Sequence, residues 1–155
     1  MNTDSLSEKD RNLLIIDDEL EITKALTRQF KKKYTVFSAT SAEEGLNIME
    51  RENIQVVMSD QRMPGMTGVD FFSKIKDLYP DAIRLLLSGY SDLNAVIKAI
   101  NEGEIFRYVA KPWNPAELEK IISDAFYNYD LVTQRRKIGE FGGAKSAIGK
   151  SNKGK

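Results

Sequence analysis

Cysteine and histidine are both absent from this chain of 155 residues. Without cysteine the protein forms no disulfide bonds and no thiolate metal sites. Without histidine it has no Ser-His-Asp triad, no histidine-bound zinc and no phosphohistidine of its own. The chemistry that remains is mainly that of carboxylates, hydroxyl groups and lysine.

Long apolar runs are absent too. No run approaches the roughly 20 residues that a membrane-spanning helix needs, and the opening residues MNTDSLSEKD have neither the basic nor the apolar part of a signal peptide. We therefore expect a cytoplasmic protein that makes no membrane contact. The length and the composition, with 41% hydrophobic and 30% charged residues, are typical of one globular domain with a single core.

The formal net charge of zero hides a segregation of charge along the chain. Residues 134–155 contain seven Lys or Arg and one acid, which leaves 16 basic and 22 acidic residues in 1–133. A basic segment can touch nucleic acid through charge alone. This one has no folded recognition element and the rest of the chain is acidic, so we expect no direct nucleic-acid binding by the domain.

Short apolar runs alternate with segments of helical periodicity from Asn12 to Val132. A short apolar run indicates a strand that is covered on both faces. Each of these runs is followed by a segment with apolar residues at helical spacing. This alternation predicts an α/β fold, with a five-stranded parallel sheet and helices on both of its faces. The predicted strands are Leu13–Asp17, Thr35–Ala39, Ile54–Ser59, Ile83–Ser88 and Phe106–Ala110.

The pattern divides the chain into three segments. Residues 1–11 are an N-terminal extension, and 12–133 form the domain. Residues 134–155 are expected to be a basic flexible tail or linker, because they have too few apolar residues to offset the entropy of ordering them. Two alternatives stay open: the last helix continues through Arg136 or Lys137 toward another module, or the end consists of residues added for expression.

Polar residues stand where the predicted strands end. In an open parallel sheet, ligands bind outside the carboxyl ends of the strands, so these side chains are expected to meet at one rim. Three carboxylates, a hydroxyl group and an ammonium group are involved. They belong to Asp17, Asp18, Asp60, Ser88 and Lys111.

Three carboxylates at one rim require a cation. Two of them about 5 Å apart repel by roughly 3 kcal/mol at an effective dielectric near 20. Hard oxygen donors without histidine or cysteine predict Mg²⁺, with Mn²⁺ as a substitute. Asp17 and Asp18 are adjacent and suited to share the ion, although Asp18 also fits a capping residue of the following helix.

The same rim suits attack of a carboxylate on phosphorus. Asp60 is the best nucleophile, because it stands alone after its strand and the turn QRMPG exposes it. Lys111 and the metal would neutralise charge on the phosphoryl oxygens, and Ser88 would donate a hydrogen bond to one of them.

From about Asn12 to Val132 the chain resembles the receiver domain of two-component response regulators. The resemblance rests on five separated elements in the family's order and spacing. They are the acid pair Asp17 and Asp18 after LLII, Asp60 followed by Met63-Pro64-Gly65 and Gly68, Ser88-Gly89, Tyr108, and Lys111-Pro112. The resemblance implies a flavodoxin-like sheet with strand order 2-1-3-4-5.

The resemblance also implies roles. Asp60 would be the phosphorylated residue, and Lys111 would pair with its phosphoryl group. Magnesium would be held by Asp18, by Asp60 and by the backbone carbonyl of Arg62, with Asp17 binding it through water. Ser88 and Tyr108 would form the switch pair that alters a distal face.

Partners follow from the same resemblance. The phosphoryl donor would be a sensor histidine kinase or a phosphotransfer protein, and phosphorylation would control a homodimer or an output domain in the full-length chain. The segments SDQRMPGM, LSGYSD and YVAKPW are similar to the corresponding segments of receivers that precede HD-GYP phosphodiesterase or NtrC-like output modules.

Two other functions remain as alternatives. The first is a Mg²⁺-dependent phosphohydrolase that also forms an aspartyl phosphate. The haloacid-dehalogenase type of that enzyme would place a second acid two residues after the nucleophile, where this chain has Arg62. The second alternative is a receiver that binds partners without being phosphorylated, which the complete set of acids, hydroxyl group and lysine disfavours. We therefore expect a signalling domain rather than an enzyme.

Overall fold

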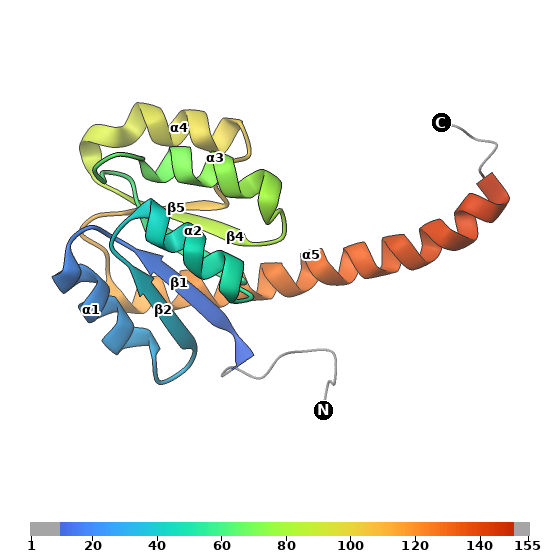
Figure 1. Ribbon diagram of the computed structural model, residues 1–155, viewed down its shortest axis with the longest axis horizontal. Helices are drawn as coiled ribbons and strands as arrows, with labels where there is room; N and C mark the ends of the chain where they lie inside the picture. The colour runs from blue at the N-terminus through green and yellow to red at the C-terminus, as the bar shows by residue number, and fades with distance from the viewer. Residues whose placement is uncertain (1–9, 151–155) are drawn as a thin grey trace.

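The computed structural model describes the backbone of residues 10–150, and the side chains of residues 10–89 and 91–139. Five parallel strands form one sheet, in the order β2-β1-β3-β4-β5. This confirms the predicted fold class and strand order (Figure 1). The strands are β1 (Asn12–Ile16), β2 (Thr35–Ala39), β3 (Val56–Asp60), β4 (Ile83–Ser88) and β5 (Arg107–Ala110).

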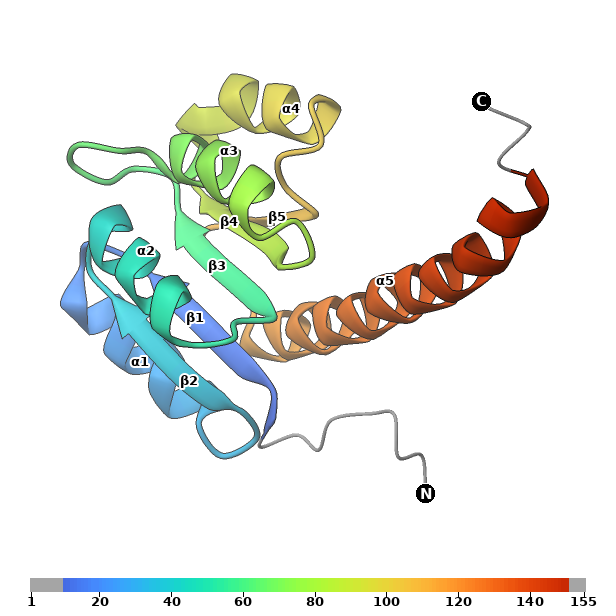
Figure 2. The ribbon, with the colours of Figure 1, turned by 45° about the vertical axis from the view of Figure 1, so that its right-hand side comes forward.

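A helical segment follows each strand. The α-helices are α1 (Leu20–Phe30), α2 (Ala42–Arg51), α3 (Gly68–Leu78), α4 (Leu93–Asn101) and α5 (Pro115–Lys150), and a short 3₁₀ turn, η2 (Tyr90–Asp92), precedes α4. Figures 1 and 2 show α2 and α3 on one side of the sheet and α1 on the other. Among the described residues, none of these helices is both long enough and apolar enough to cross a membrane.

The two faces of the sheet carry separate apolar clusters. Successive side chains of a strand point to opposite faces. In β1, Leu13 and Ile15 therefore pack with α1 and α5, whereas Leu14 and Ile16 pack with α2, α3 and α4. All four side chains are fully buried. This two-sided burial explains why the run Leu13–Ile16 of β1 is apolar throughout.

Side-chain caps fix where two of the helices begin. The Ser41 hydroxyl accepts a hydrogen bond from the Glu44 N–H at 3.1 Å, and Asn114 Oδ1 accepts one from the Glu117 N–H at 3.0 Å. In both cases the acid stands three residues after the capping residue, which is the sequence spacing typical of a helix start. Asp18 does not cap α1, because the residue before that helix is Glu19 and α1 has no side-chain cap.

Strand register sets the residues at the rim side by side. Ile16 of β1 pairs with Ser59 of β3, so the next residues along each strand, Asp17 and Asp60, are neighbours. In the same way Ser88, the last residue of β4, pairs with Ala110 of β5, and Lys111 follows directly. The carboxyl ends of β1, β3 and β5 therefore deliver their polar side chains to one edge of the sheet.

The last helix is longer than the sequence pattern indicated. A flexible segment was expected from residue 134, but α5 is helical through Lys150 and projects beyond the sheet in both views (Figures 1 and 2). Arg136 forms an ion pair with Asp81, in the loop before β4, which ties the helix to the domain past residue 133. Residues 151–155 and most of the predicted 1–11 extension lie outside the described residues, and the domain boundaries stay predictions.

Candidate functional site

Three aspartates meet at the carboxyl edge of the sheet. One carboxylate oxygen from each of Asp17, Asp18 and Asp60 lies within 4.8 Å of the others. Asp17 and Asp60 are buried and Asp18 is exposed. The group is therefore partly enclosed by the protein and open to solvent on one side.

Asp17 is the most deeply enclosed of the three. Its side chain is fully buried, and Oδ1 accepts a hydrogen bond from the Glu19 N–H at 2.9 Å. Oδ2 is buried without a hydrogen-bond partner, and Lys111 Nζ lies 3.7 Å from it. Burial raises the pKa of Asp17 to about 6, and the charge of Asp60 adds to this increase.

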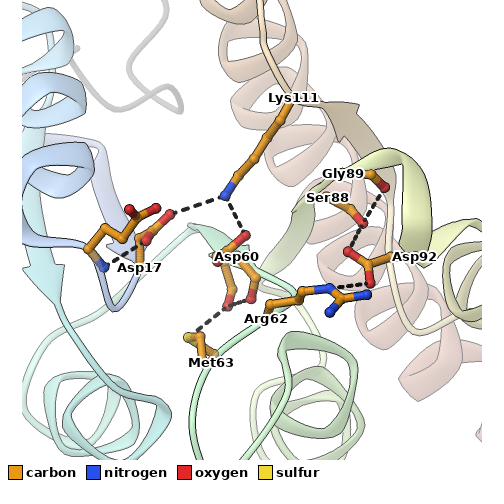
Figure 3. A network of polar contacts seen from close by, with 10 residues as sticks. Asp17, Asp60, Arg62, Met63, Ser88, Gly89, Asp92 and Lys111 are labelled. Carbon is orange, nitrogen blue, oxygen red and sulfur yellow. Dashed lines mark hydrogen bonds and ion pairs between the residues drawn. The ribbon is translucent and has the colours of Figure 1, made fainter.

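Lys111 is the cation of the site. Its Nζ lies 2.7 Å from Asp60 Oδ1, which is the distance of a charge-assisted hydrogen bond (Figure 3). Burial raises the pKa of Asp60, and the lysine only partly opposes that effect. For Lys111 itself, burial lowers the pKa, but the hydrogen bond and charge of Asp60 outweigh burial and the pKa is raised.

The donor set fits a small divalent cation. Three carboxylates against a single ammonium group leave excess negative charge, and Asp17 Oδ2 offers a buried lone pair that no donor uses. Buried acceptors are normally satisfied, so an atom of this kind indicates a ligand. Oxygen donors of this type suit Mg²⁺ or Mn²⁺.

A cleft of about 450 Å³ lies over these carboxylates. Asp18, Asp60 and Lys111 line one part of it, and Arg62 and Asp92 line another. The start of α3 packs closely against the backbone of Asp60, because a Cβ atom on Gly68 would lie 2.5 Å from the backbone oxygen of Asp60. The cleft is large enough for a phosphoryl group beside the carboxylates.

A second polar network lies beside the carboxylates. Asp92 in η2 accepts a hydrogen bond from the Ser88 hydroxyl at 2.9 Å through Oδ2, and one from Arg62 Nε at 2.9 Å through Oδ1 (Figure 3). Arg62 also donates to the Ser91 hydroxyl at 2.9 Å. Sequence reasoning did not assign Asp92 to the site. Its position four residues after Ser88, across a helical turn, is the only signal that could have indicated it.

The family follows from a direct comparison. A family model described as the response regulator receiver domain matches residues 13–123. The chain belongs to this family. It is thus a receiver domain, as the resemblance in its sequence predicted.

Individual relatives agree with this assignment. The chain is 35% identical over 120 residues to the hydrogenase transcriptional regulatory protein HoxA of Cupriavidus necator, which covers 77% of this chain and 25% of that protein. The chain thus spans about a quarter of the length of HoxA. The signal receiver domain of an HD domain-containing protein from Pseudomonas fluorescens Pf-5 superposes with a TM-score of 0.79 at 30% identity, covering 87% of this chain and 99% of that one.

The structure brings most of the predicted residues of this receiver domain together. Asp17, Asp18, Asp60 and Lys111 form one group, whereas the Ser88 hydroxyl makes its hydrogen bonds to Asp92 and to the Gly89 carbonyl. Tyr108 is half-buried on β5 and packs against the cluster beneath α3 and α4, outside the cleft. The roles of these residues remain predictions.

Proposed function

We propose that Asp60 accepts a phosphoryl group from a phosphohistidine on a sensor histidine kinase or a phosphotransfer protein. A carboxylate oxygen of Asp60 forms a bond to phosphorus while the bond from phosphorus to the imidazole nitrogen breaks. The products are an acyl phosphate on Asp60 and a free histidine on the donor. The observation that carries the proposal is the position of Asp60, which lines an open cleft and is paired at 2.7 Å with Lys111.

The residues around Asp60 support this chemistry. Bound at Asp17, Asp18 and Asp60, Mg²⁺ would neutralise negative charge on the phosphoryl oxygens, and Mn²⁺ could replace it. The resemblance adds the backbone carbonyl of Arg62 to this ligand set. Lys111 is held over the carboxylate group, where its charge would stabilise the same oxygens.

The phosphohydrolase alternative is not supported by a specific contact. Such an enzyme needs a group that hands a proton to the leaving alcohol and later activates water. The residue two positions after Asp60 is Arg62, whose guanidinium has hydrogen-bond donors but no acceptor atom and is bonded to Asp92 and Ser91. The receiver function therefore accounts better for the site.

Partners beyond the phosphoryl donor are also proposed from the structure and the relatives. The chain spans a quarter of the length of HoxA, and this share supports an output module in a longer protein. Leu93, Ile97 and Ile100 are about half exposed on α4 and offer an apolar surface for a homodimer that depends on phosphorylation. Such a system would operate in the cytoplasm.

The test is labelling with a small phosphodonor. Incubation with Mg²⁺ and acetyl phosphate should add one phosphoryl group to the wild type, seen as intact mass, and chelation of Mg²⁺ should prevent it. The Asp60→Asn variant should gain no mass, while Asp70→Asn, an exposed aspartate in the first turn of α3, should label normally. Equal labelling of the wild type and Asp60→Asn would refute the assignment. Many turnovers of an added phosphomonoester would favour the hydrolase instead.

A further inference from the structure

The hydroxyl group of Ser88 is committed to Asp92. It lies 2.9 Å from Asp92 Oδ2 and 3.3 Å from the carbonyl oxygen of Gly89. A serine has one hydroxyl proton, and a carboxylate accepts it more strongly than a carbonyl. Ser88 is fully buried, so bulk water does not compete for this proton. The proton is therefore unavailable to a phosphoryl oxygen on Asp60 while this bond persists.

Arg62 fixes the carboxylate that holds Ser88. Its Nε donates to Asp92 Oδ1 at 2.9 Å, so the two oxygens of Asp92 are divided between Arg62 and Ser88 (Figure 3). The Asp92 side chain is only 9% exposed, whereas that of Arg62 is 69% exposed. An ion pair with so exposed a partner is weak and screened by salt. Asp92 is thus oriented by a bond that can be released.

Asp92 also stands directly before α4, at the position where aspartate normally caps a helix. A capping aspartate accepts hydrogen bonds from N–H groups of the first turn, and its own backbone is extended. Asp92 makes no such bond, and its φ of −99° and ψ of 12° differ from the φ of −151° and ψ of 159° at Ser41, which caps α2. The carboxylate suited to cap α4 is occupied by Ser88 and Arg62.

We propose that Asp92 is a positioning residue that couples the phosphorylation site to α4. Before phosphorylation its carboxylate holds the Ser88 hydroxyl away from Asp60. A phosphoryl group on Asp60 competes for the same hydroxyl proton. When Ser88 donates to the phosphoryl group instead, the carboxylate of Asp92 is free to cap the first turn of α4. This inference rests on the proposed function of Asp60.

The coupling is measured with beryllofluoride, a non-covalent mimic of a phosphoryl group, in the presence of Mg²⁺. Binding affinity is determined by calorimetry for the wild type, Asp92→Ala, Ser88→Ala and the double variant. Asp92→Ala should bind on the order of tenfold more tightly than the wild type, because no hydrogen bond to Ser88 must be broken. Removal of the negative charge of Asp92 also favours binding of the beryllofluoride anion, but this effect is the same whether or not residue 88 has a hydroxyl group. The part of the gain that vanishes in the Ser88→Ala background is the coupling.

The outcomes separate this inference from the function on which it depends. A coupling of about fivefold or more supports the role of Asp92. Equal tightening in both backgrounds, with normal binding by the wild type, overturns that role and leaves Asp60 as the acceptor. Absence of Mg²⁺-dependent binding by the wild type refutes the proposed function and this inference together. Asp81→Ala, which removes an ion-paired aspartate at the other end of β4, should bind as the wild type does.

Hydrogen exchange tests the second half of the proposal. With Asp92 as a cap, its carboxylate accepts hydrogen bonds from the backbone N–H groups of Asn94 and Ala95, the second and third residues of α4. Beryllofluoride should slow exchange of these two amides in the wild type and leave them unchanged in Asp92→Ala. Should Asp92→Ala not fold, Asp92→Leu and Arg62→Gln serve in its place, and Arg62→Gln should raise affinity to a smaller extent. Unchanged exchange in the wild type upon saturation would contradict the capping step.

Discussion

The ammonium nitrogen of Lys111 lies 2.7 Å from a carboxylate oxygen of Asp60, across the sheet edge between β5 and β3. The same nitrogen is 3.7 Å from Asp17 Oδ2, the buried oxygen that lacks a hydrogen-bond donor. Lys111 and a divalent cation would therefore bind the same carboxylates. The lysine stabilises the acidic group, but its charge also opposes the arrival of a second cation.

Removing this charge should strengthen metal binding. We expect Lys111→Met to bind Mg²⁺ several-fold more tightly than the wild type, because a positive charge a few ångströms from the ligands is lost. Fluorescence of Trp113, the only tryptophan of the chain, is a convenient readout because the residue is two positions from Lys111. Lys120→Met is the control, since Lys120 pairs on the surface with Asp124. Weaker Mg²⁺ binding by Lys111→Met would contradict the electrostatic account.

Stability without metal should depend on the protonation of Asp17. Burial raises its pKa from 3.8 to about 6, so the folded protein holds a proton that the unfolded chain has already released between these values. The contribution to stability is complete below the unfolded pKa and is lost as the pH rises through 6. By linkage, the loss amounts to about 3 kcal/mol at pH 8.

Asp17→Asn should reverse this loss. In a chelator at pH 8 the variant should be more stable than the wild type by about 1–3 kcal/mol, since the neutral amide avoids burial of charge yet can still accept the Glu19 N–H bond. Its advantage should shrink toward pH 4, and saturating Mg²⁺ should stabilise only the wild type strongly. Urea unfolding across this pH range provides the measurement. A variant that is less stable than the wild type at pH 8 would show that Asp17 is not under electrostatic strain.

The close contact between α3 and β3 predicts that a methyl group added at Gly68 lowers the stability of the fold. Gly68→Ala would place Cβ 2.5 Å from the Asp60 carbonyl oxygen and 2.8 Å from Leu86 Cδ1. We expect a destabilisation of about 1–3 kcal/mol in urea unfolding, with weaker Mg²⁺ binding because the backbone of Asp60 is displaced. Gly89→Ala is the matched control, since its Cβ would meet nothing within 4 Å. Equal stability of Gly68→Ala and the wild type would mean that α3 can shift freely away from the site.

The base of α5 is held by a partly buried ion pair. Arg11 donates to Asp130 Oδ2 at 2.8 Å, and its guanidinium carbon lies 5.4 Å from the centre of the Phe126 ring. Arg11→Ala should lower the free energy of unfolding by about 1–2 kcal/mol, through loss of the pair and of the cation–π contact. Lys120→Ala, which breaks an exposed pair, should cost at most about 0.5 kcal/mol. Similar values for the two variants would show that Arg11 does not anchor α5.

Parallel-sheet geometry explains how much of this arrangement was predictable. Asp17 and Asp60 follow apolar runs, and neighbouring parallel strands in register place such residues together whatever the loops do. The direction of the Ser88 hydroxyl was not predictable in this way. It depends on the 3₁₀ turn of η2, which returns Asp92 to within 2.9 Å of Ser88, and no apolar pattern reports a turn of that kind.

The length of α5 was hidden for a different reason. Glycines at 139, 142 and 143 and the low apolar content after Val132 argue against a helix on local propensity. The ion pair between Arg136 and Asp81 joins residues 55 positions apart, and such a contact is visible only once the fold is known. Tertiary contacts of this type routinely override local preference.

The most direct test of the central claim is chemical location of the phosphoryl group. Borohydride reduces an aspartyl phosphate to homoserine, so the receiver domain is first phosphorylated with acetyl phosphate and Mg²⁺, then reduced, digested and sequenced by mass spectrometry. Our account predicts homoserine at position 60 and intact aspartate at positions 17 and 18. Homoserine at either of those positions, or a phosphorylated protein with no homoserine at all, would contradict it.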